Sequence, residues 1–306
     1  RVAKYGYLGA DLFFLISGFI VLHSAWNQTP RSFWVARIAR LCPAYWVAVT
    51  LTAGISVLFG AGRFPVDATQ YAANLTMLNS PAGLGAVDPV YWTLWAELRF
   101  YVVIAVLVFF VATPRRVSVV AWTWLGLTAL LELGVLPSSA DLVLDTQYSH
   151  YFIAGMALAM VYRFGPSRSW LALIALCELN ALYRGAQYAG ELADRYRTPV
   201  QPLVVAGAIV AFFWVMLAVA LRLTPGTAGA RFTTLAALTY PLYLIHGQIG
   251  FIVFQRLGDR VGKYLLLAGT TVAMAVTAYL INRLVERPLA PVLTRMLGSS
   301  HRGKHR

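Results

Sequence analysis

Residues 6–25, GYLGADLFFLISGFIVLHSA, form an apolar run long enough to cross a lipid bilayer as a helix. A membrane-spanning helix needs about 20 predominantly apolar residues, and this run meets that length. Asp11, Ser17 and His23 lie inside this run. Ionisable groups are costly in hydrocarbon and indicate function by default. Two roles stay open for Asp11: pairing with another polar group of the bundle, or contact with a substrate.

Similar apolar runs recur along the whole chain, which has 59% hydrophobic residues, 12% charged residues and a mean hydropathy of +0.66. Soluble domains carry about 25% charged residues. We therefore predict an all-α fold, a polytopic transmembrane helix bundle, with a single membrane domain over residues 1–290 and a basic tail over 291–306. No low-complexity tract or linker indicates a second domain.

The net charge of +13 comes from Lys and Arg in short loops between the apolar runs. This distribution favours topology control and contact with membrane lipids, and it argues against nucleic acid as a partner. The two cysteines, Cys42 and Cys177, have no metal-ligand spacing, and we expect no metal site.

Nine spans are predicted, near 8–26, 43–61, 90–112, 117–136, 148–163, 168–184, 200–222, 232–255 and 264–285. Residues 184–197 are expected to be a polar connection, and Pro43 to stand at a helix start. The Lys and Arg bias places the C-terminus in the cytoplasm of a multi-pass cell-membrane protein. An N-terminus outside the membrane without an export signal is awkward. One further helix before Arg1, giving ten spans, would remove the difficulty.

The segment that follows the first span contains two arginines three residues apart, Arg37 and Arg40, followed by Pro43. Residues at this spacing share one face of a helix. The planar, permanently charged guanidinium suits phosphate groups, so the pair is a candidate site for a phosphate-rich ligand. An ordinary positive anchor at the membrane surface is the alternative.

A second segment, YWTLWAELRFY over residues 91–101, places Glu97 inside a predicted span. Arg99 is two residues away and points to a different face, so the two should not pair, whereas Tyr101 shares the face of Glu97. A buried carboxylate can orient or accept a proton. A structural ion pair with another helix is the alternative role of Glu97.

A third segment, LTYPLYLIHG over residues 238–247, aligns Thr239, Tyr243 and His246 on one helical stripe. Pro241 should loosen the helix at this point. His246 is therefore either a hydrogen-bonded core histidine or a group that contacts a substrate.

These segments, in this order, resemble the motifs of the membrane acyltransferase 3 family. GADLFFLISGF over residues 9–19 is similar to its first motif, and Arg37 to Pro43 are similar to its Arg-x-x-Arg-x-x-Pro motif. Residues 92–101 resemble its Trp-(Ser/Thr)-Leu-x-x-Glu-x-x-Phe-Tyr motif, and residues 239–246 its Ser-Tyr-x-x-Tyr-Leu-x-His motif, with Thr239 for Ser. Weaker similarities are found at Phe152 to Gly155 and at Glu286 to Pro288.

The resemblance implies an integral-membrane O-acyltransferase of the bacterial inner membrane. Such an enzyme moves an acyl group, expected to be acetyl, from the co-substrate acyl-CoA (acetyl-CoA) to a hydroxyl of a carbohydrate or glycosylated small molecule. No cofactor is expected to stay bound. Arg37 and Arg40 would hold the donor's phosphates, while Glu97 and His246 are the catalytic candidates. The substrate-binding candidates are Asp11, Ser17, Trp92, Tyr101 and Tyr243.

The family's characteristic catalytic histidine lies in a helix that would precede Arg1, and in this interpretation Glu97 orients it. A transporter of a polar solute is the alternative function. In that interpretation Asp11, Glu97, Arg99 and His246 form the binding site or relay, and the Pro-containing helix is typical of transporters. The absence of an inverted repeat favours the enzyme.

Overall fold

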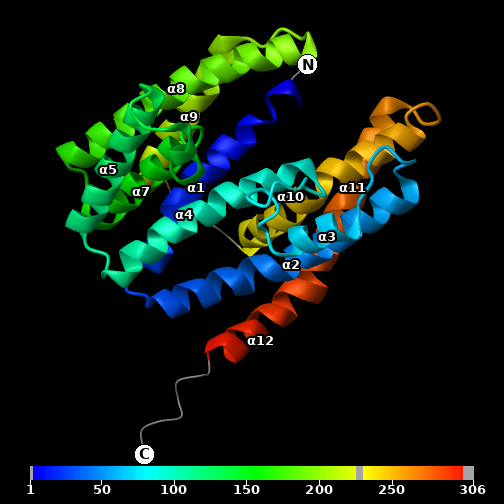
Figure 1. Ribbon diagram of the computed structural model, residues 1–306, viewed down its shortest axis with the longest axis horizontal. Coiled ribbons are helices and arrows are strands. Elements are labelled where there is room, and N and C mark those ends of the chain that lie inside the picture. The colour runs from blue at the N-terminus through cyan, green and yellow to red at the C-terminus, as the bar shows by residue number, and fades with distance from the viewer. Residues whose placement is uncertain (1–2, 225–229, 299–306) are drawn as a thin grey trace, which may run out of the picture. The chain divides into compact units, whose positions relative to one another are not determined.

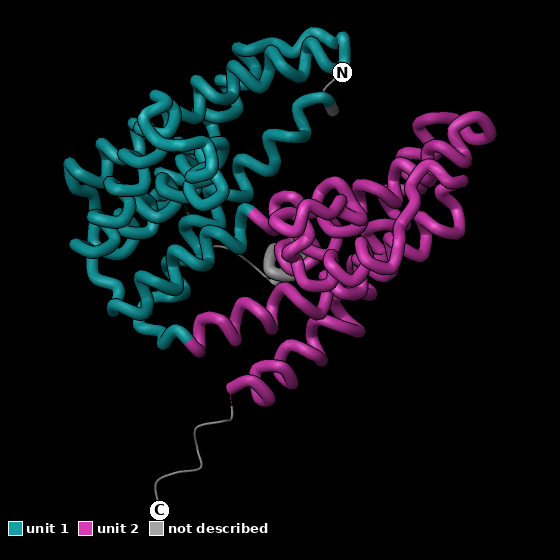
Figure 2. Tube along the Cα trace, in the orientation of Figure 1, with its two compact units in different colours: residues 1–30, 96–226 teal, residues 31–95, 227–306 magenta. Residues whose placement is uncertain are grey.

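The computed structural model describes residues 3–224 and 230–298, with side chains from residues 4–224 and 236–298. All regular secondary structure of the described residues is helical, with no strand, which confirms the all-α prediction. They form two compact units (Figure 2). Unit 1 comprises residues 1–30 and 96–226, and unit 2 comprises residues 31–95 and 227–306.

Unit 1 is built mainly from five long helices (Figure 1): α1 (Leu8–Ala25), α5 (Pro114–Glu132), α7 (Ser149–Phe164), α8 (Arg168–Tyr196) and α9 (Pro202–Ala220), together with most of α4 (Trp92–Phe109). Shorter elements are η1 (Ala3–Tyr5), η3 (Ser138–Ala140) and α6 (Asp141–Leu144). Unit 2 contains α2 (Pro30–Phe59), α3 (Ala68–Leu75), η2 (Pro89–Tyr91), α10 (Ala230–Leu257), α11 (Lys263–Ile281), η4 (Asn282–Glu286) and α12 (Arg287–Gly298).

In unit 1, α1 and α7 pack closely through two glycines. A Cβ on Gly18 would lie 2.4 Å from the carbonyl oxygen of Phe152, and one on Gly155 would lie 2.4 Å from that of Leu15. Glycine at both positions lets the backbones touch, as small residues do in membrane bundles. Gly155 of the weak Phe-x-x-Gly similarity is thus the partner of Gly18 in this contact.

Three helices of unit 1 run in the same direction. Phe14 packs on Phe152 and His23 on Tyr162, so α1 and α7 are parallel. The backbone N–H of Gln201, just before α9, donates to the Tyr5 hydroxyl (3.2 Å), and Arg222, just after α9, donates to the carbonyl of Tyr162 (3.2 Å). These directions agree with the predicted alternation, in which the first, fifth and seventh spans run the same way.

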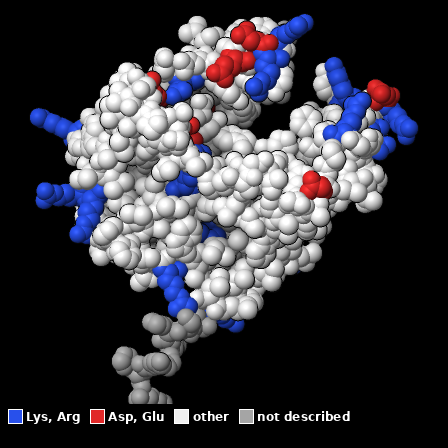
Figure 3. All heavy atoms as spheres, viewed as in Figure 1, with Lys and Arg blue, Asp and Glu red and all other residues white. Residues whose placement is uncertain are grey.

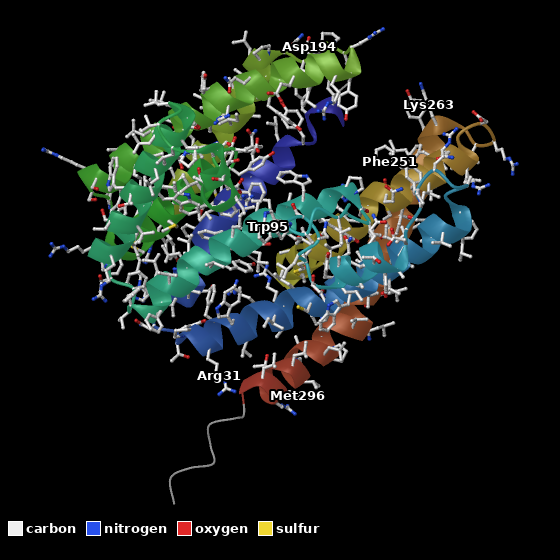
Figure 4. All side chains as sticks on the ribbon, viewed as in Figure 1. Arg31, Trp95, Asp194, Phe251, Lys263 and Met296 are labelled. Carbon is white, nitrogen blue, oxygen red and sulfur yellow. The ribbon has the colours of Figure 1, made fainter. Side chains whose placement is uncertain are left out.

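In unit 2, the directions of two helices also agree with the predicted alternation of the spans. Tyr240 donates to the carbonyl of Leu41 (3.2 Å) and Arg256 to that of Phe59 (2.8 Å), so α2 and α10 are parallel. Arg31 lies near Met296 (Figure 4) and donates to the carbonyl of Leu297 (2.5 Å). The end of α12 therefore lies beside the start of α2.

A helix stands at each of the nine positions predicted to span. Within the described residues, six segments are long and apolar enough to cross a membrane: Leu8–Ala25, Pro30–Phe59, Pro89–Phe109, Pro202–Ala220, Ala236–Leu257 and Lys263–Gly298. On the face shown in Figure 3, charged side chains form separate small groups, and broad stretches between them carry none. Together these features describe a multi-pass membrane protein.

Three predicted boundaries were wrong. Pro43 lies inside α2 because that helix already begins at Pro30. The expected polar connection from Arg184 continues α8 as far as Tyr196. The chain also stays helical beyond residue 285, through a π-helical turn into α12. Arg, Glu, Gln and Ala are good helix formers, so charge alone does not end these helices. Residues 299–306 of the expected tail lie outside the described residues.

Candidate functional site

A polar network in unit 2 surrounds Tyr243 of α10. The Tyr243 hydroxyl lies 2.8 Å from the carbonyl oxygen of Val90, to which it donates, and 2.8 Å from the hydroxyl of Thr93. Thr93 also donates to the carbonyl of Val90 (3.1 Å). The Tyr243 side chain is therefore held between α10 and the start of α4 in a fixed rotamer.

His246 lies one turn further along α10, with an exposed side chain. Its Nδ1 lies 2.8 Å from the carbonyl oxygen of Tyr243. A carbonyl only accepts, so this contact places the proton of the neutral ring on Nδ1 and leaves the lone pair on Nε2. The arrangement suits a group that accepts a proton from a substrate hydroxyl. Thr239, the third member of the predicted stripe, bonds to the carbonyl of Ala236 (2.7 Å).

Asp88 is a second polar residue of this region, and the sequence motifs did not indicate it. Its side chain has 0% exposure. One carboxylate oxygen accepts from the backbone N–H of Val90 (3.1 Å) and the other from that of Gln248 on α10 (2.8 Å). Burial raises the pKa of Asp88, and the two N–H donors oppose that rise. The only sequence signal was an Asp-Pro pair, which is typical of a helix start.

The predicted donor arginines, also in unit 2, differ in their surroundings. Arg37 is 6% exposed, and its guanidinium lies 5.5 Å from the ring centre of Phe33. Arg40 is exposed and lies within electrostatic reach of Glu286. Glu286 accepts from the Asn282 side chain (2.6 Å). Arg40 is therefore the member of the pair that a phosphate can reach directly. Trp92, a substrate-binding candidate at the start of α4, is 41% exposed.

Glu97 and Tyr101 form a buried pair on the part of α4 that belongs to unit 1. They are 5% and 2% exposed, and the tyrosine hydroxyl donates to Oε1 of Glu97 at 2.5 Å. Arg99 instead forms an ion pair with Asp145 (3.0 Å), so the prediction that Arg99 and Glu97 face apart is confirmed. Burial raises the pKa of Asp145 to about 6, although the Arg99 charge acts in the opposite direction.

Asp11 lies in a second polar region of unit 1, where it is 8% exposed and accepts a hydrogen bond from Tyr151. A cavity of about 20 Å³ is lined by Asp11, Tyr7, Gln147, Tyr148, Tyr151, Arg184, Gly185 and Tyr188. This volume holds about one water molecule. Arg184 also pairs with Glu132 (2.7 Å). Ser17 is 6% exposed, beside the Gly18 contact with α7.

His150 on α7 is the other residue that the sequence analysis missed. It is 0% exposed and stacks on Tyr151 with ring centres 4.3 Å apart. No motif or spacing indicated it. Among the described residues, no three His, Cys, Asp or Glu side chains come together as metal ligands.

Residues 5–283 match the family whose description is "Acyltransferase domain", the acyltransferase 3 family. The match covers most of the chain, including all four motif segments. The chain belongs to the acyltransferase 3 family.

Two curated proteins are similar to this acyltransferase 3 chain over part of its length. One is the exopolysaccharide production protein ExoZ of Rhizobium meliloti, 32% identical over 165 residues, which are 50% of each chain. The other is the peptidoglycan O-acetyltransferase OatA of Listeria monocytogenes, 26% identical over 192 residues, which are 53% of this chain and 30% of that protein. The similarity thus spans half or less of these relatives. No solved structure matches the chain.

The family's motif residues occur in both units of the structure. Glu97, Tyr101, Asp11 and Ser17 belong to unit 1. Arg37, Arg40, Trp92, Tyr243 and His246 belong to unit 2. Unit 1 combines the buried Glu97–Tyr101 pair and the pocket at Asp11, whereas unit 2 combines the arginine pair and the network at Tyr243 and His246.

Proposed function

We propose that this protein is an integral-membrane O-acyltransferase that moves an acyl group, acetyl in the simplest case, from acyl-CoA to a hydroxyl of a carbohydrate. Membership in the acyltransferase 3 family carries the proposal. The names of the two relatives indicate exopolysaccharide production and peptidoglycan O-acetylation, and these functions support a carbohydrate acceptor.

The donor would bind at the cytoplasmic side through its phosphates. Arg40 is exposed and three residues from Arg37, whose burial fixes this part of α2. Arg31 lies at the start of the same helix, beside the end of α12. A concentration of arginine at one helix end suits both phosphate binding and the positive-inside rule, and it supports the proposal of a cytoplasmic C-terminus.

The chemistry requires removal of a proton from the acceptor hydroxyl and attack of its oxygen on the thioester carbonyl. The tetrahedral intermediate then collapses, an ester forms, and coenzyme A leaves as the thiol after taking up the proton. His246 has the geometry for the proton step, because its Nδ1 is engaged by the carbonyl of Tyr243 and its Nε2 retains the lone pair. Tyr243 would orient the acceptor. Glu97, held by Tyr101, would orient the family's characteristic catalytic histidine, as the resemblance implies.

Membranes that contain the protein, incubated with radiolabelled acetyl-CoA, test the proposal. Label should appear on lipid-linked or soluble carbohydrate and should be released as acetate by mild alkali, as expected for an ester. Membranes with His246→Ala should transfer at least about 100-fold less, the typical contribution of one acid–base group. Uptake of a polar solute without any labelled ester would instead support a transporter.

A further inference from the structure

The connection between α2 and α4 does not stay near Phe59, where α2 ends, but runs back along α2. The indole N–H of Trp46 donates to the carbonyl of Leu75, at the end of α3 (3.0 Å). Trp46 precedes Phe59, the end of α2, by 13 residues, which is about 20 Å along the helix. On α10, Arg256 bonds to Phe59, and Gln248, eight residues earlier, contacts Asp88. Asp88 therefore also lies away from the end of α2. Residues 76–91, which we name the re-entrant segment, therefore fold back along α2 and α10.

Side chains of α3 satisfy the irregular backbone of the re-entrant segment. Asn74 is 0% exposed, donates to the carbonyl of Gly85 (2.9 Å) and accepts from the N–H of Val87 (3.0 Å). Gln70 also donates to the carbonyl of Gly85 (3.2 Å). Buried backbone groups of an irregular segment need such hydrogen-bond partners. The segment is thus a built feature of unit 2.

Asp88 fastens the end of this segment to α10 beside the proposed catalytic groups. A helix cap needs only the bond from one carboxylate oxygen to Val90, but the second oxygen binds the N–H of Gln248, two residues after His246. Gly247 leaves the space for the Asp88 carboxylate, since a Cβ at this position would lie 2.5 Å from Oδ1 of Asp88. The carboxylate also lies within electrostatic reach of His246.

We propose that the re-entrant segment positions the acceptor, with Asp88 as the positioning residue that fixes His246 and Tyr243 toward a carbohydrate hydroxyl. This inference rests on the proposed function. Three contacts with α10 support the inference. Asp88 and Val90 of the re-entrant segment contact Gln248 and Tyr243, respectively, and Thr93 at the start of α4 also contacts Tyr243. A positioned imidazole that accepts a proton becomes cationic, and a nearby carboxylate stabilises that state.

The test compares Asp88→Asn with Asp67→Asn in the full chain, using acetyl-CoA and the carbohydrate acceptor labelled in the membrane assay. Asp67 is a matched control because it is an exposed helix cap preceding the same segment, accepting from the N–H of Gln70 (2.7 Å). Asp88→Asn should lower kcat about 10- to 100-fold and raise the KM of the acceptor. The KM of acetyl-CoA should stay as in the wild type. The melting temperature in detergent should fall, because the Asn amide leaves one of the two backbone N–H donors without an acceptor, so kcat is expressed per folded protein. Asp67→Asn should change none of these.

Gly247→Ala provides an independent variant, because it keeps every polar group while its Cβ would displace the Asp88 carboxylate (2.5 Å from Oδ1) and the Val90 side chain (2.9 Å from Cγ1). It should give the same acceptor-selective loss, and Tyr243→Phe should raise the KM of the acceptor without changing that of acetyl-CoA. If the wild type transfers acetyl groups and all three variants behave as the wild type, or affect both substrates equally, the positioning role is refuted and the proposed function stands. Absence of transfer by the wild type refutes the proposed function together with this inference.

Discussion

Replacing Glu97 by Gln separates a catalytic role of this residue from a structural one. The carboxylate is 5% exposed and accepts a 2.5 Å hydrogen bond from Tyr101, which is 2% exposed. Gln keeps the shape and an acceptor oxygen for the tyrosine but removes the charge. A charge-assisted hydrogen bond is worth about 1.5–3 kcal/mol, so Tyr101→Phe should cost roughly that much stability. Glu97→Gln should cost less stability, because the hydrogen bond can re-form.

For turnover, the two variants should rank in the opposite order, with the larger loss in Glu97→Gln. A missing electrostatic partner of a catalytic group lowers the rate by about 10²–10³, or about 3–4 kcal/mol in the barrier. We therefore expect Glu97→Gln to lose about 100-fold or more in kcat with a melting temperature near that of the wild type. Tyr101→Phe should lose less activity and more stability.

The assay measures acetyl transfer beside the melting temperature of the detergent-solubilised protein. Glu178→Gln on α8 is the control, as a half-buried carboxylate of unit 1 with no proposed role, and it should leave turnover unchanged. A fall in melting temperature with Glu97→Gln that matches or exceeds that of Tyr101→Phe, with activity lost in proportion to folded protein, would refute the catalytic reasoning and assign Glu97 to structure.

Three further predictions follow from the geometry. Arg40→Glu should raise the KM of acetyl-CoA at least tenfold and leave that of the acceptor unchanged, whereas Arg295→Glu on α12 should alter neither. Gly18→Ala places a Cβ 2.4 Å from a carbonyl oxygen of α7 and should lower the free energy of unfolding by about 1–3 kcal/mol, measured by chemical denaturation. The pKa of Asp145, raised to about 6 in the folded state, should make unit 1 more stable as pH falls from 7 to 5. A group with a raised folded-state pKa stabilises in its protonated form and loses that contribution as pH rises through 6, so Asp145→Asn should flatten this dependence.

The apolar runs predicted a helix at each of nine positions because a membrane-spanning segment must satisfy its backbone internally and cover it with apolar side chains. Local spacing also succeeded on α4. Tyr101 is four residues from Glu97 and bonds to it, whereas Arg99, two residues away, reaches Asp145. Both outcomes follow from the helical repeat alone.

The boundaries that failed depend on contacts that hydropathy does not register. Polar residues before Pro43 suggested a loop, yet α2 continues through them with Arg37 buried and its guanidinium near Phe33. The long arginine side chain can bury its aliphatic part and its charge together when an aromatic ring lies beside it. A hydropathy average over a window of residues counts Arg37 as a polar residue that interrupts the apolar run.

Asp88 and His150 were missed in the sequence for a different reason: only their tertiary contacts distinguish them from ordinary residues. Asp88 resembles any helix cap until Gln248, 160 residues later, supplies its second donor. His150 occupies an ordinary apolar run and becomes notable only because it is completely buried. Neither residue belongs to a motif with a spacing that chemistry requires.

Glycine has the same physical role in each of the two units: it leaves space that another group fills. At Gly18 and Gly155 the absent side chains let two backbones meet, and at Gly247 the absence lets a carboxylate reach a helix backbone. In each case the glycine is visible in the sequence while the group that needs its space lies far along the chain. The contacts beside Gly247 join the re-entrant segment to the helix of Tyr243 and His246, so a methyl group there alters polar geometry without removing a polar atom. Small residues thus determine where polar residues of this bundle lie, although they take no part in the chemistry themselves.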